Sequence, residues 1–242
     1  MDLRIAFDVM DHSILKIKLE HYGFRGIFLD LIMSFLSNRN YFVSVNGLKS
    51  ETRISNIGVP QGSTLGPLLF LIFVNDMKNS SLILKFLQFA DDSTLLFSCS
   101  DINTLNKTLE REIKKVMEWF NANKLIINLT KTKCMLFSNK CNRPNLDINI
   151  NNISLEHVSE TIFLGVVIDC KLSWKAHIQH ISRKISKSIA ILKLVKYSFP
   201  ISALKLIYMS IIFSHINYCN LIWGSANKTT LEPLLKLQKK SC

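Results

Sequence analysis

Hydrophobic residues recur along the chain at two spacings, and the spacing separates the helices we expect from the strands. Intervals of three and four residues bring side chains to one face and predict amphipathic helices. Ser13 is expected to cap the first of these helices, and Pro67 is expected to open the third. The predicted helices cover residues 14–19, 27–36, 67–77, 105–120, 174–192 and 206–223.

Short apolar runs that flank turn residues predict β-hairpins. Asn46 and Gly47, the pair that most favours a two-residue hairpin turn, lie between two such runs. Asp91 and Asp92 lie between two others, at the expected tip of a second hairpin. Because strands and helices follow one another in mixed order, we expect an α+β fold whose antiparallel sheet is covered by helices on one face. The predicted strands cover residues 1–7, 41–45, 48–54, 84–89, 93–97, 125–129, 134–137 and 163–168.

The charge of the chain, +12 overall, is concentrated in its C-terminal part. Residues 1–170 carry 18 Lys and Arg against 17 Asp and Glu, whereas residues 171–242 carry 12 against a single acid. This asymmetry indicates two regions with different tasks, and it favours a polyanionic partner, either nucleic acid or an anionic membrane. Arg183, Lys184 and Lys187 fall largely off the apolar stripe of their predicted helix, which suits binding to phosphates; a solvated basic face is the alternative.

Cysteine spacing and the N-terminus bear on the compartment. The six cysteines show no paired short spacing of the kind that binds zinc, so we expect free, reduced thiols. The first residues do not have the charged lead and apolar run of a signal peptide. Residues 206–223 carry too many polar side chains for a membrane span. We therefore expect an intracellular protein, in the nucleus or cytoplasm, that is neither secreted nor embedded in a membrane.

The aspartates at the second hairpin tip are candidates for a metal site. Two adjacent carboxylates repel each other unless a cation lies between them, and a hard divalent ion meets that need. An Asp-Asp turn alone is a common structural feature, so a third carboxylate is needed to support a metal site. Asp2, beside a short apolar segment, is the candidate.

Six segments, in order and spacing, resemble motifs of reverse transcriptases from non-LTR retrotransposons of the jockey type. The first three resemble catalytic motifs, the others resemble later blocks, and together they span essentially the whole chain. They are MDLRIAFDVMDH (1–12), GVPQGSTLGPLLF (58–70), FADD (89–92), WFNANKLIINLTKTKCMLF (119–137), FLGVVID (163–169) and SHINYCNLIWG (214–224).

The resemblance implies a polymerase palm over residues 1–170 and a basic, mainly helical thumb over 171–242, with the fingers largely absent. It implies that Asp2, Asp91 and Asp92 hold two Mg²⁺ ions, or Mn²⁺ as a substitute, for RNA-directed DNA synthesis. The implied partners are an RNA template, a DNA primer and deoxynucleoside triphosphates.

The resemblance also implies roles for other residues. Lys131 matches a lysine that protonates the departing pyrophosphate, although a surface lysine is the alternative. Phe7 matches an aromatic residue beside the incoming sugar, although a core phenylalanine is the alternative. The implied nucleotide- and template-binding residues are Phe7, Pro60, Gln61, Gly62 and Phe89, and the implied primer grip is Leu164 and Gly165.

Three functions remain open from the sequence. The first is a reverse transcriptase, or a part of one. The second is an inactive relic that binds RNA or an RNA/DNA duplex through the basic thumb. The third is a metal-dependent nuclease that uses the same aspartates.

Overall fold

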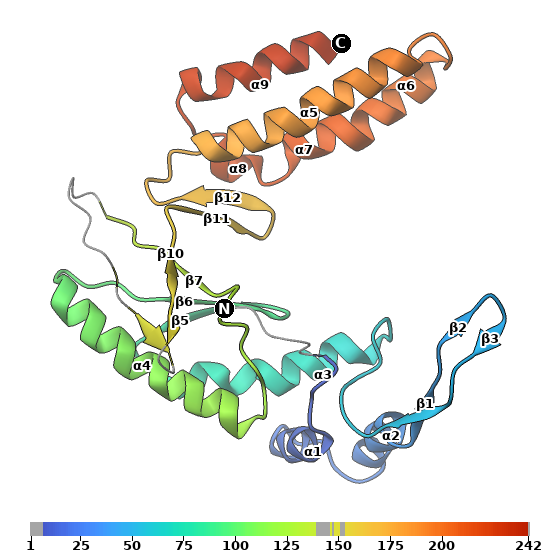
Figure 1. Ribbon diagram of the computed structural model, residues 1–242, viewed down its shortest axis with the longest axis vertical. Coiled ribbons are helices and arrows are strands. Elements are labelled where there is room, and N and C mark those ends of the chain that lie inside the picture. Colours follow the sequence, from blue (N-terminus) through green and yellow to red (C-terminus); the bar gives the residue numbers. More distant parts are fainter. Residues whose placement is uncertain (1–6, 139–145, 147, 151–152, 242) are drawn as a thin grey trace. The chain divides into compact units, whose positions relative to one another are not determined.

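The computed structural model describes residues 7–138, 146, 148–150 and 153–241, and Figure 1 shows their helices and strands. Residues 1–6 of the strand expected over 1–7, including Asp2, lie outside the described residues, and Phe7 lies in a turn. The chain forms two compact units. The first contains the described residues up to 134 and those from 146 to 156, and the second contains 135–138 and 157–241. The architecture is a mixture of helices and strands, as expected, but the described strands form small two-stranded sheets in place of the one expected antiparallel sheet.

The helices of the first unit form where the apolar periodicity predicts them. The N-cap of α1 is Asp11 rather than the predicted Ser13, because the Asp11 carboxylate accepts hydrogen bonds from the backbone N–H groups of Ser13 and Ile14. Helix α3 begins two residues before Pro67 and continues as a 3₁₀ helix, η1. The bounds are α1 His12–His21, α2 Ile27–Leu36, α3 Leu65–Val74, η1 Asn75–Ser80 and α4 Ile102–Ala122.

Both predicted hairpins are present. Asn46 and Gly47 have φ values of +50° and +83°, as a type I′ turn requires, so this turn prediction is confirmed. The strands that carry the aspartates pair from Lys85↔Leu96 to Phe89↔Asp92. The bounds are β1 Arg39–Tyr41 paired with β4 Arg53–Ser55, β2 Ser44–Val45 with β3 Leu48–Lys49, and β5 Lys85–Phe89 with β6 Asp92–Leu96.

The predicted pairing of residues 125–129 with 134–137 is wrong. Leu125 and Ile127 are buried in the core of the first unit instead of forming a strand of that length. The strand after them is shorter than predicted and lies beside Glu156. The bounds here are β7 Lys133–Cys134 with β10 Glu156–His157, and β8 Asn149–Ile150 with β9 Ile153–Ser154.

The core of the first unit lies between α1, α3 and α4, and the half-buried Lys18 lies at its edge. The Lys18 ammonium donates to the Phe73 carbonyl and forms an ion pair with Asp76 at 2.7 Å. It also lies 4.6 Å from the centroid of the Phe73 ring and 4.9 Å from that of Trp119. Burial lowers the pKa of Lys18, and the Asp76 carboxylate opposes that shift. Lys18 therefore links α1 to the end of α3 and to α4.

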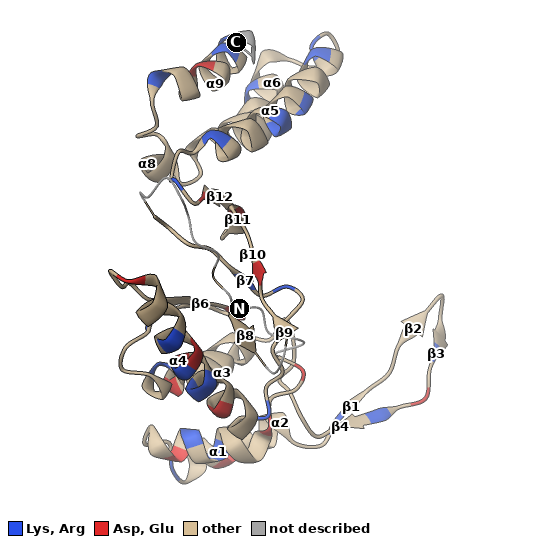
Figure 2. Ribbon diagram, turned by 60° about the vertical axis from the view of Figure 1, so that its left-hand side comes forward, with Lys and Arg blue, Asp and Glu red and all other residues tan. Residues whose placement is uncertain are grey.

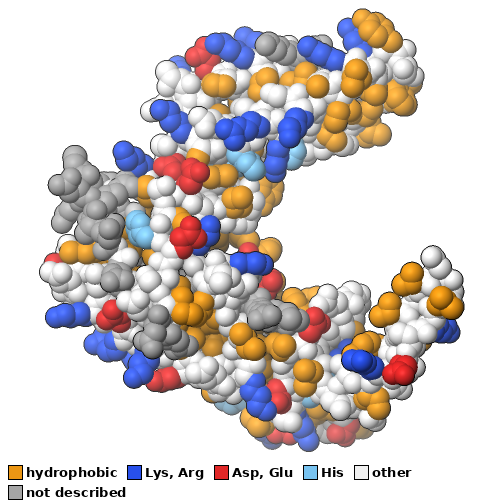
Figure 3. Space-filling view, in the orientation of Figure 1, with side chains coloured by type: hydrophobic (Ala, Val, Ile, Leu, Met, Phe, Trp, Pro, Cys, Tyr) orange, Lys and Arg blue, Asp and Glu red, His pale blue; other side chains and the backbone are white. Residues whose placement is uncertain are grey.

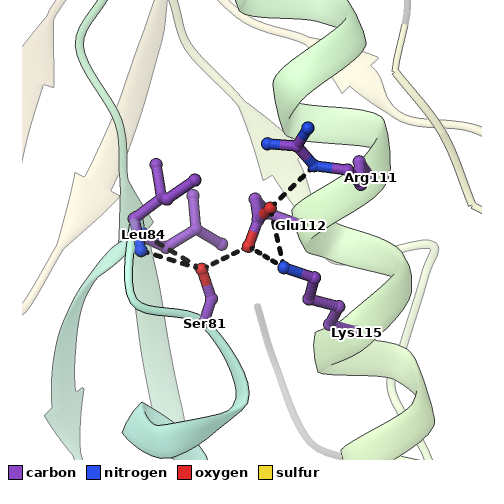
Figure 4. Close-up of polar contacts among 6 residues, drawn as sticks. Ser81, Leu84, Arg111, Glu112 and Lys115 are labelled. Atoms are coloured by element: carbon purple, nitrogen blue, oxygen red, sulfur yellow. Dashed lines mark hydrogen bonds and ion pairs between the residues drawn. The ribbon is translucent and has the colours of Figure 1, made fainter.

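Glu112, on the inward face of α4, is the centre of a second polar link (Figure 4). Its carboxylate accepts from the Ser81 hydroxyl at 2.7 Å and from Lys115 and Arg111 at 3.0 Å each. The Ser81 oxygen in turn accepts from the backbone N–H of Leu84, just before β5. These bonds lower the pKa of Glu112 to about 2, with Ser81 as the largest cause. Glu112 therefore fixes the start of the aspartate hairpin on α4.

The second unit combines one hairpin with a group of helices. The single strand predicted over 163–168 is in fact a hairpin, because Leu164 and Gly165 form its turn. The predicted helix over 206–223 is also wrong as one element: a π-helical segment interrupts it, and Tyr218 is extended. The bounds are β11 Glu160–Phe163, β12 Val166–Asp169, α5 Lys175–Val195, α6 Ile201–Tyr208, η2 Met209–Phe213, α7 Ser214–Asn217, α8 Asn220–Trp223 and α9 Lys228–Ser241.

The apolar stripe of α5 forms the core of this second unit, as its periodicity predicts. Ile178, Ile181, Ile185 and Ile189 are buried against Ile212 and residues of α8 and α9. Cys99, Cys134 and Cys219 are free thiols, as expected. Among the helices that the structure describes, none combines the length and apolar character needed to cross a bilayer.

The Glu112 contacts generate a prediction about stability at acid pH. Because the pKa of Glu112 is about 2 in the folded chain and 4.5 as its ordinary value, its contribution is complete above pH 4.5 and falls as the pH drops towards 2. Glu112→Gln should therefore destabilise the chain at pH 7 by about 1–3 kcal/mol and flatten this acid dependence. Urea unfolding followed by circular dichroism between pH 2 and 7 measures both effects.

Glu110→Gln is the matched control for that measurement. Glu110 is an exposed residue of the same helix, so its substitution should leave the unfolding profile close to that of the wild type. Parallel profiles for Glu112→Gln and the wild type would contradict the role assigned to Glu112.

Candidate active site

The hairpin formed by β5 and β6 presents two adjacent carboxylates at its tip. Ala90 has a φ of +50° and turns the chain, so that Asp91 follows in the turn and Asp92 pairs with Phe89 as the first residue of β6. Asp91 is half-buried and Asp92 is exposed. Neither carboxylate has a hydrogen-bond or ion-pair partner among the residues that the structure describes. Two uncompensated carboxylates are a donor set that fits a hard cation such as Mg²⁺.

Asp2, the third carboxylate predicted for this site, lies outside the described residues. Within the described ranges there is no group of three His, Cys, Asp or Glu side chains that could hold a metal ion. Phe89, expected to contact nucleotide or template, is 65% exposed at the end of β5, beside the carboxylates in sequence. The position of Phe89 therefore leaves its ring available to a ligand.

The glycine-rich loop of residues 58–62 is joined to the second half of the first motif. The Gly58 N–H donates to the Met10 carbonyl at 2.7 Å, and the Val59 N–H donates to the Phe7 carbonyl at 2.8 Å. Gly58 has a φ of +72°, and a Cβ on it would lie 2.6 Å from the carbonyl oxygen of Asp8. Only glycine therefore fits this approach without a shift of the backbone.

Side chains on both sides of this junction support it. The Gly58 carbonyl accepts from His12 Nε2 at 2.7 Å and from Arg39 at 2.8 Å. The Gln61 amide donates to Oδ1 of Asp8 at 2.9 Å. These contacts bring the predicted loop and the end of the first motif together, and they orient Gln61 along the surface. Gln61 and Gly62 are exposed, and Pro60 is half-buried.

Phe7 and Lys131 each had a structural alternative to the predicted role, a core phenylalanine and a surface lysine, and they lie in different surroundings. The Phe7 ring is half-buried and packs on Phe70 with centroids 4.5 Å apart, so it contributes to the core. Lys131 lies in an exposed turn whose backbone is bonded to the Asn128 carbonyl. The catalytic role predicted for Lys131 stays a prediction.

The predicted primer grip is in the second unit. Leu164 and Gly165 form the two-residue turn between β11 and β12, with φ values of +45° and +81°. The Leu164 carbonyl accepts a hydrogen bond from the Tyr218 hydroxyl at 2.7 Å. This turn is thus held by a residue 54 positions later in the chain.

The basic face of α5 is also in the second unit. Arg183, Lys184 and Lys187 are exposed, on the side of the helix opposite the buried isoleucine stripe. Figure 2 shows the basic residues along α5, and Figure 3 shows basic side chains gathered over the viewed face of this unit. The pKa of His180 is lowered by burial and by Lys184 and Arg183, so this face is positive without histidine protonation.

Comparison with known proteins explains why these elements occur together. A family model described as reverse transcriptase (RNA-dependent DNA polymerase) matches residues 1–168. The chain belongs to the reverse transcriptase family. This result confirms the resemblance inferred from the motifs, and it establishes the lineage as that of a nucleotidyltransferase.

Individual relatives are retrotransposon proteins. The RNA-directed DNA polymerase from the mobile element jockey of Drosophila funebris is 29% identical over 250 positions, which cover 99% of this chain and 27% of that protein. Its Drosophila melanogaster counterpart is 28% identical over 100% of the chain. A probable RNA-directed DNA polymerase from the Drosophila melanogaster transposon BS is 26% identical over 100% of the chain. The chain spans about 27% of the length of the jockey proteins that it matches.

Several residues of this reverse transcriptase chain organise the site although sequence reasoning assigned them no role. Asp8 and Arg39 hold the loop of residues 58–62, and Tyr218 holds the turn of the primer grip. Asp8 and Tyr218 lie inside the matched motifs, which is a signal that they contribute to the site. Arg39 lies outside the motifs, and its contact with residue 58 is visible only in the fold.

The close approach at Gly58 generates a prediction. Gly58→Ala adds a methyl group against the Asp8 backbone in addition to the strain of a positive φ, so it should lower stability by about 1–3 kcal/mol beyond that strain. Gly62→Ala is the matched control, since its φ is +80° but no atom lies within 4 Å of its Cβ position. Thermal unfolding of both variants separates the clash from the strain, and equal losses of stability would count against the junction.

Proposed function

We propose that this chain supplies the palm carboxylates and the primer-binding elements for RNA-directed DNA synthesis. The observation that supports this most directly is the pair Asp91 and Asp92, two carboxylates at a hairpin tip that have no partner among the described residues, within a reverse transcriptase chain. The proposed palm covers residues 1–170, and the proposed thumb covers residues 171–242. The proposed substrates are an RNA template, a DNA primer and deoxynucleoside triphosphates.

The carboxylates would bind the metal ions that nucleotidyl transfer requires. Asp91 and Asp92, together with Asp2, would hold two Mg²⁺ ions, which supply charge stabilisation at the attacking and leaving oxygens of nucleotidyl transfer. The Glu112 network and the core beneath α4 keep the hairpin in place, so the carboxylates need little reorganisation when cations bind. Lys131 is proposed as the proton donor to the leaving pyrophosphate.

The remaining residues would position the nucleic acids. Gln61, held by Asp8, and the backbone at Gly62, where no side chain stands in the way, would lie against the nucleotide and template base, with Pro60, Phe7 and Phe89. Leu164 and Gly165 would hold the primer end, and the basic face of α5 would bind the duplex backbone. Each of these roles needs exposure, and the structure leaves Gln61, Gly62 and Phe89 exposed.

Replacement of one carboxylate tests this proposal. Asp91→Asn keeps the size of the side chain and removes its charge, so Mg²⁺-dependent extension of a DNA primer on an RNA template should fall at least about a hundredfold. Asp30→Asn, at an exposed position of α2, is the control and should extend the primer like the wild type. Undiminished synthesis by Asp91→Asn would overturn the assignment of this carboxylate.

Binding of RNA or of an RNA/DNA duplex without catalysis is a second candidate function, and the exposed basic face of α5 favours it. Phosphate contacts release counterions, so affinity should fall steeply with salt concentration. Wild-type chain that binds a primer–template in this way but makes no DNA with Mg²⁺ or Mn²⁺ would support this candidate over the first.

The α5 face can be tested whichever function holds. The double substitution Lys184→Gln and Lys187→Gln should weaken duplex binding and reduce the slope of log affinity against log salt by about 0.7–0.9 for each phosphate that is no longer neutralised. Lys107→Gln with Lys114→Gln, two exposed positions on α4, provides a control of equal charge change. A salt titration by fluorescence anisotropy measures the slopes, and equal effects of the two pairs would contradict a specific role for α5.

A further inference from the structure

The turn between β11 and β12 has a backbone that its own sequence does not favour. A two-residue turn of this kind places both central residues at positive φ, which suits glycine or asparagine. Gly165 meets this requirement, but Leu164, with a φ of +45°, does not. A leucine in this conformation persists only when its surroundings hold it there.

Tyr218 supplies that support from the helical part of the same unit. Its hydroxyl donates to the Leu164 carbonyl at 2.7 Å. Its ring lies over Gly165 so closely that a Cβ there would be 3.3 Å from Cε1 of the tyrosine. The ring thus fills the space that the absent side chain leaves, and the hydroxyl reaches past it to the turn.

The backbone around Tyr218 is shaped to present this side chain. The π-helical segment η2 precedes it, α7 ends at Asn217, and Tyr218 itself is extended with a ψ of 118°. Cys219 follows with a φ of +53° and is the N-cap residue of α8. The Trp223 indole N–H donates to the Tyr218 carbonyl at 2.9 Å, which fixes the break between the two short helices. Irregular helical turns of this kind are frequent at functional sites.

A buried histidine completes a ring of contacts back to the hairpin. The Val167 N–H, on β12, donates to Nδ1 of His177 at 3.2 Å. The His177 ring lies 5.6 Å from the ring of Trp223. Burial lowers the pKa of His177, which keeps the imidazole neutral and able to accept this bond. The order of contacts is therefore Leu164, Tyr218, Trp223, His177 and Val167, and it holds the hairpin at two points.

We propose that Tyr218 is a positioning residue for the primer 3′ end. It acts through the Leu164–Gly165 turn, whose backbone it holds in the conformation that contacts the primer. This inference rests on the proposed function, in which that turn is the primer grip. It also assigns a role to the motif of residues 214–224, which contains Tyr218 and Trp223. No other part of the proposed mechanism uses this motif.

Removal of the Tyr218 hydroxyl is the test. Tyr218→Phe keeps the ring on Gly165 and deletes one hydrogen bond, so the chain should fold. Tyr197→Phe is the matched control, because it makes the same chemical change at a tyrosine of the same unit that is 91% exposed. The first readout is amide hydrogen exchange of the unliganded full chain over residues 160–169. Tyr218→Phe should exchange faster there than the wild type, and Tyr197→Phe should not.

The second readout separates primer positioning from a structural role alone. The affinity for an RNA template with an annealed, recessed DNA primer is compared with the affinity for the same RNA without primer. Tyr218→Phe should weaken binding of the primed template about three- to tenfold, the range for one hydrogen bond, and leave binding of the bare template unchanged. Loss of both affinities in equal proportion, or of neither, overturns the inference.

The outcomes also distinguish this inference from the proposed function. Neither readout requires turnover, so a chain that fails to extend a primer can still show both effects of Tyr218→Phe. In that case the polymerase proposal fails and primer positioning stands. Exchange rates of Tyr218→Phe that equal those of Tyr197→Phe overturn the inference even where the wild type makes DNA.

Discussion

The backbones of Gly58 and Asp8 lie so close together that no side chain fits between them, and the arrangement of the first unit follows from this approach. Two backbone hydrogen bonds, to the carbonyls of Phe7 and Met10, join the segments. His12 and Arg39 then bind the Gly58 carbonyl from α1 and β1. Because three elements meet at one peptide group, the loop that follows has little freedom, and Gln61 can be oriented by Asp8. A glycine that permits close contact here also sets the position of residues expected to meet a nucleotide.

In the second unit, a turn is held by a distant side chain instead of by a close backbone approach. A glycine and a leucine form the β11–β12 turn, and a distant tyrosine supports the less suitable of the two. In both units, a short turn or loop is held by contacts from residues far away in sequence, and in the second unit Leu164 has an unfavourable φ. Local strain of this kind is typical of functional sites, since a surface must be rigid before a ligand arrives.

The sequence predicted the elements whose signal is local. Helices α2, α4 and α5 follow from long apolar stripes, and the turn at Asn46 and Gly47 follows from the φ preference of those two residues. The pairing of residues 125–129 failed because alternating apolar residues also suit an irregular segment against a core, as Leu125 and Ile127 show. The helix over 206–223 failed because apolar composition does not reveal a π-helical segment or an extended Tyr218.

The candidate site also contains features that the sequence predicted and features that it did not. Adjacent aspartates between two apolar runs were sufficient to predict a carboxylate tip, because strand, turn and charge are all read from neighbouring residues. The supports of the site were not predictable, because a hydrogen bond between residues 164 and 218, or between residues 39 and 58, leaves no local pattern. The charge pattern on α5 is local and was predictable. The spacing of the isoleucines placed Arg183, Lys184 and Lys187 off the apolar stripe, and the fold confirms that the stripe is buried and that these three residues are exposed. The helix that stabilises the second unit is therefore the same helix that offers phosphate contacts, so substitutions on its two faces affect different properties.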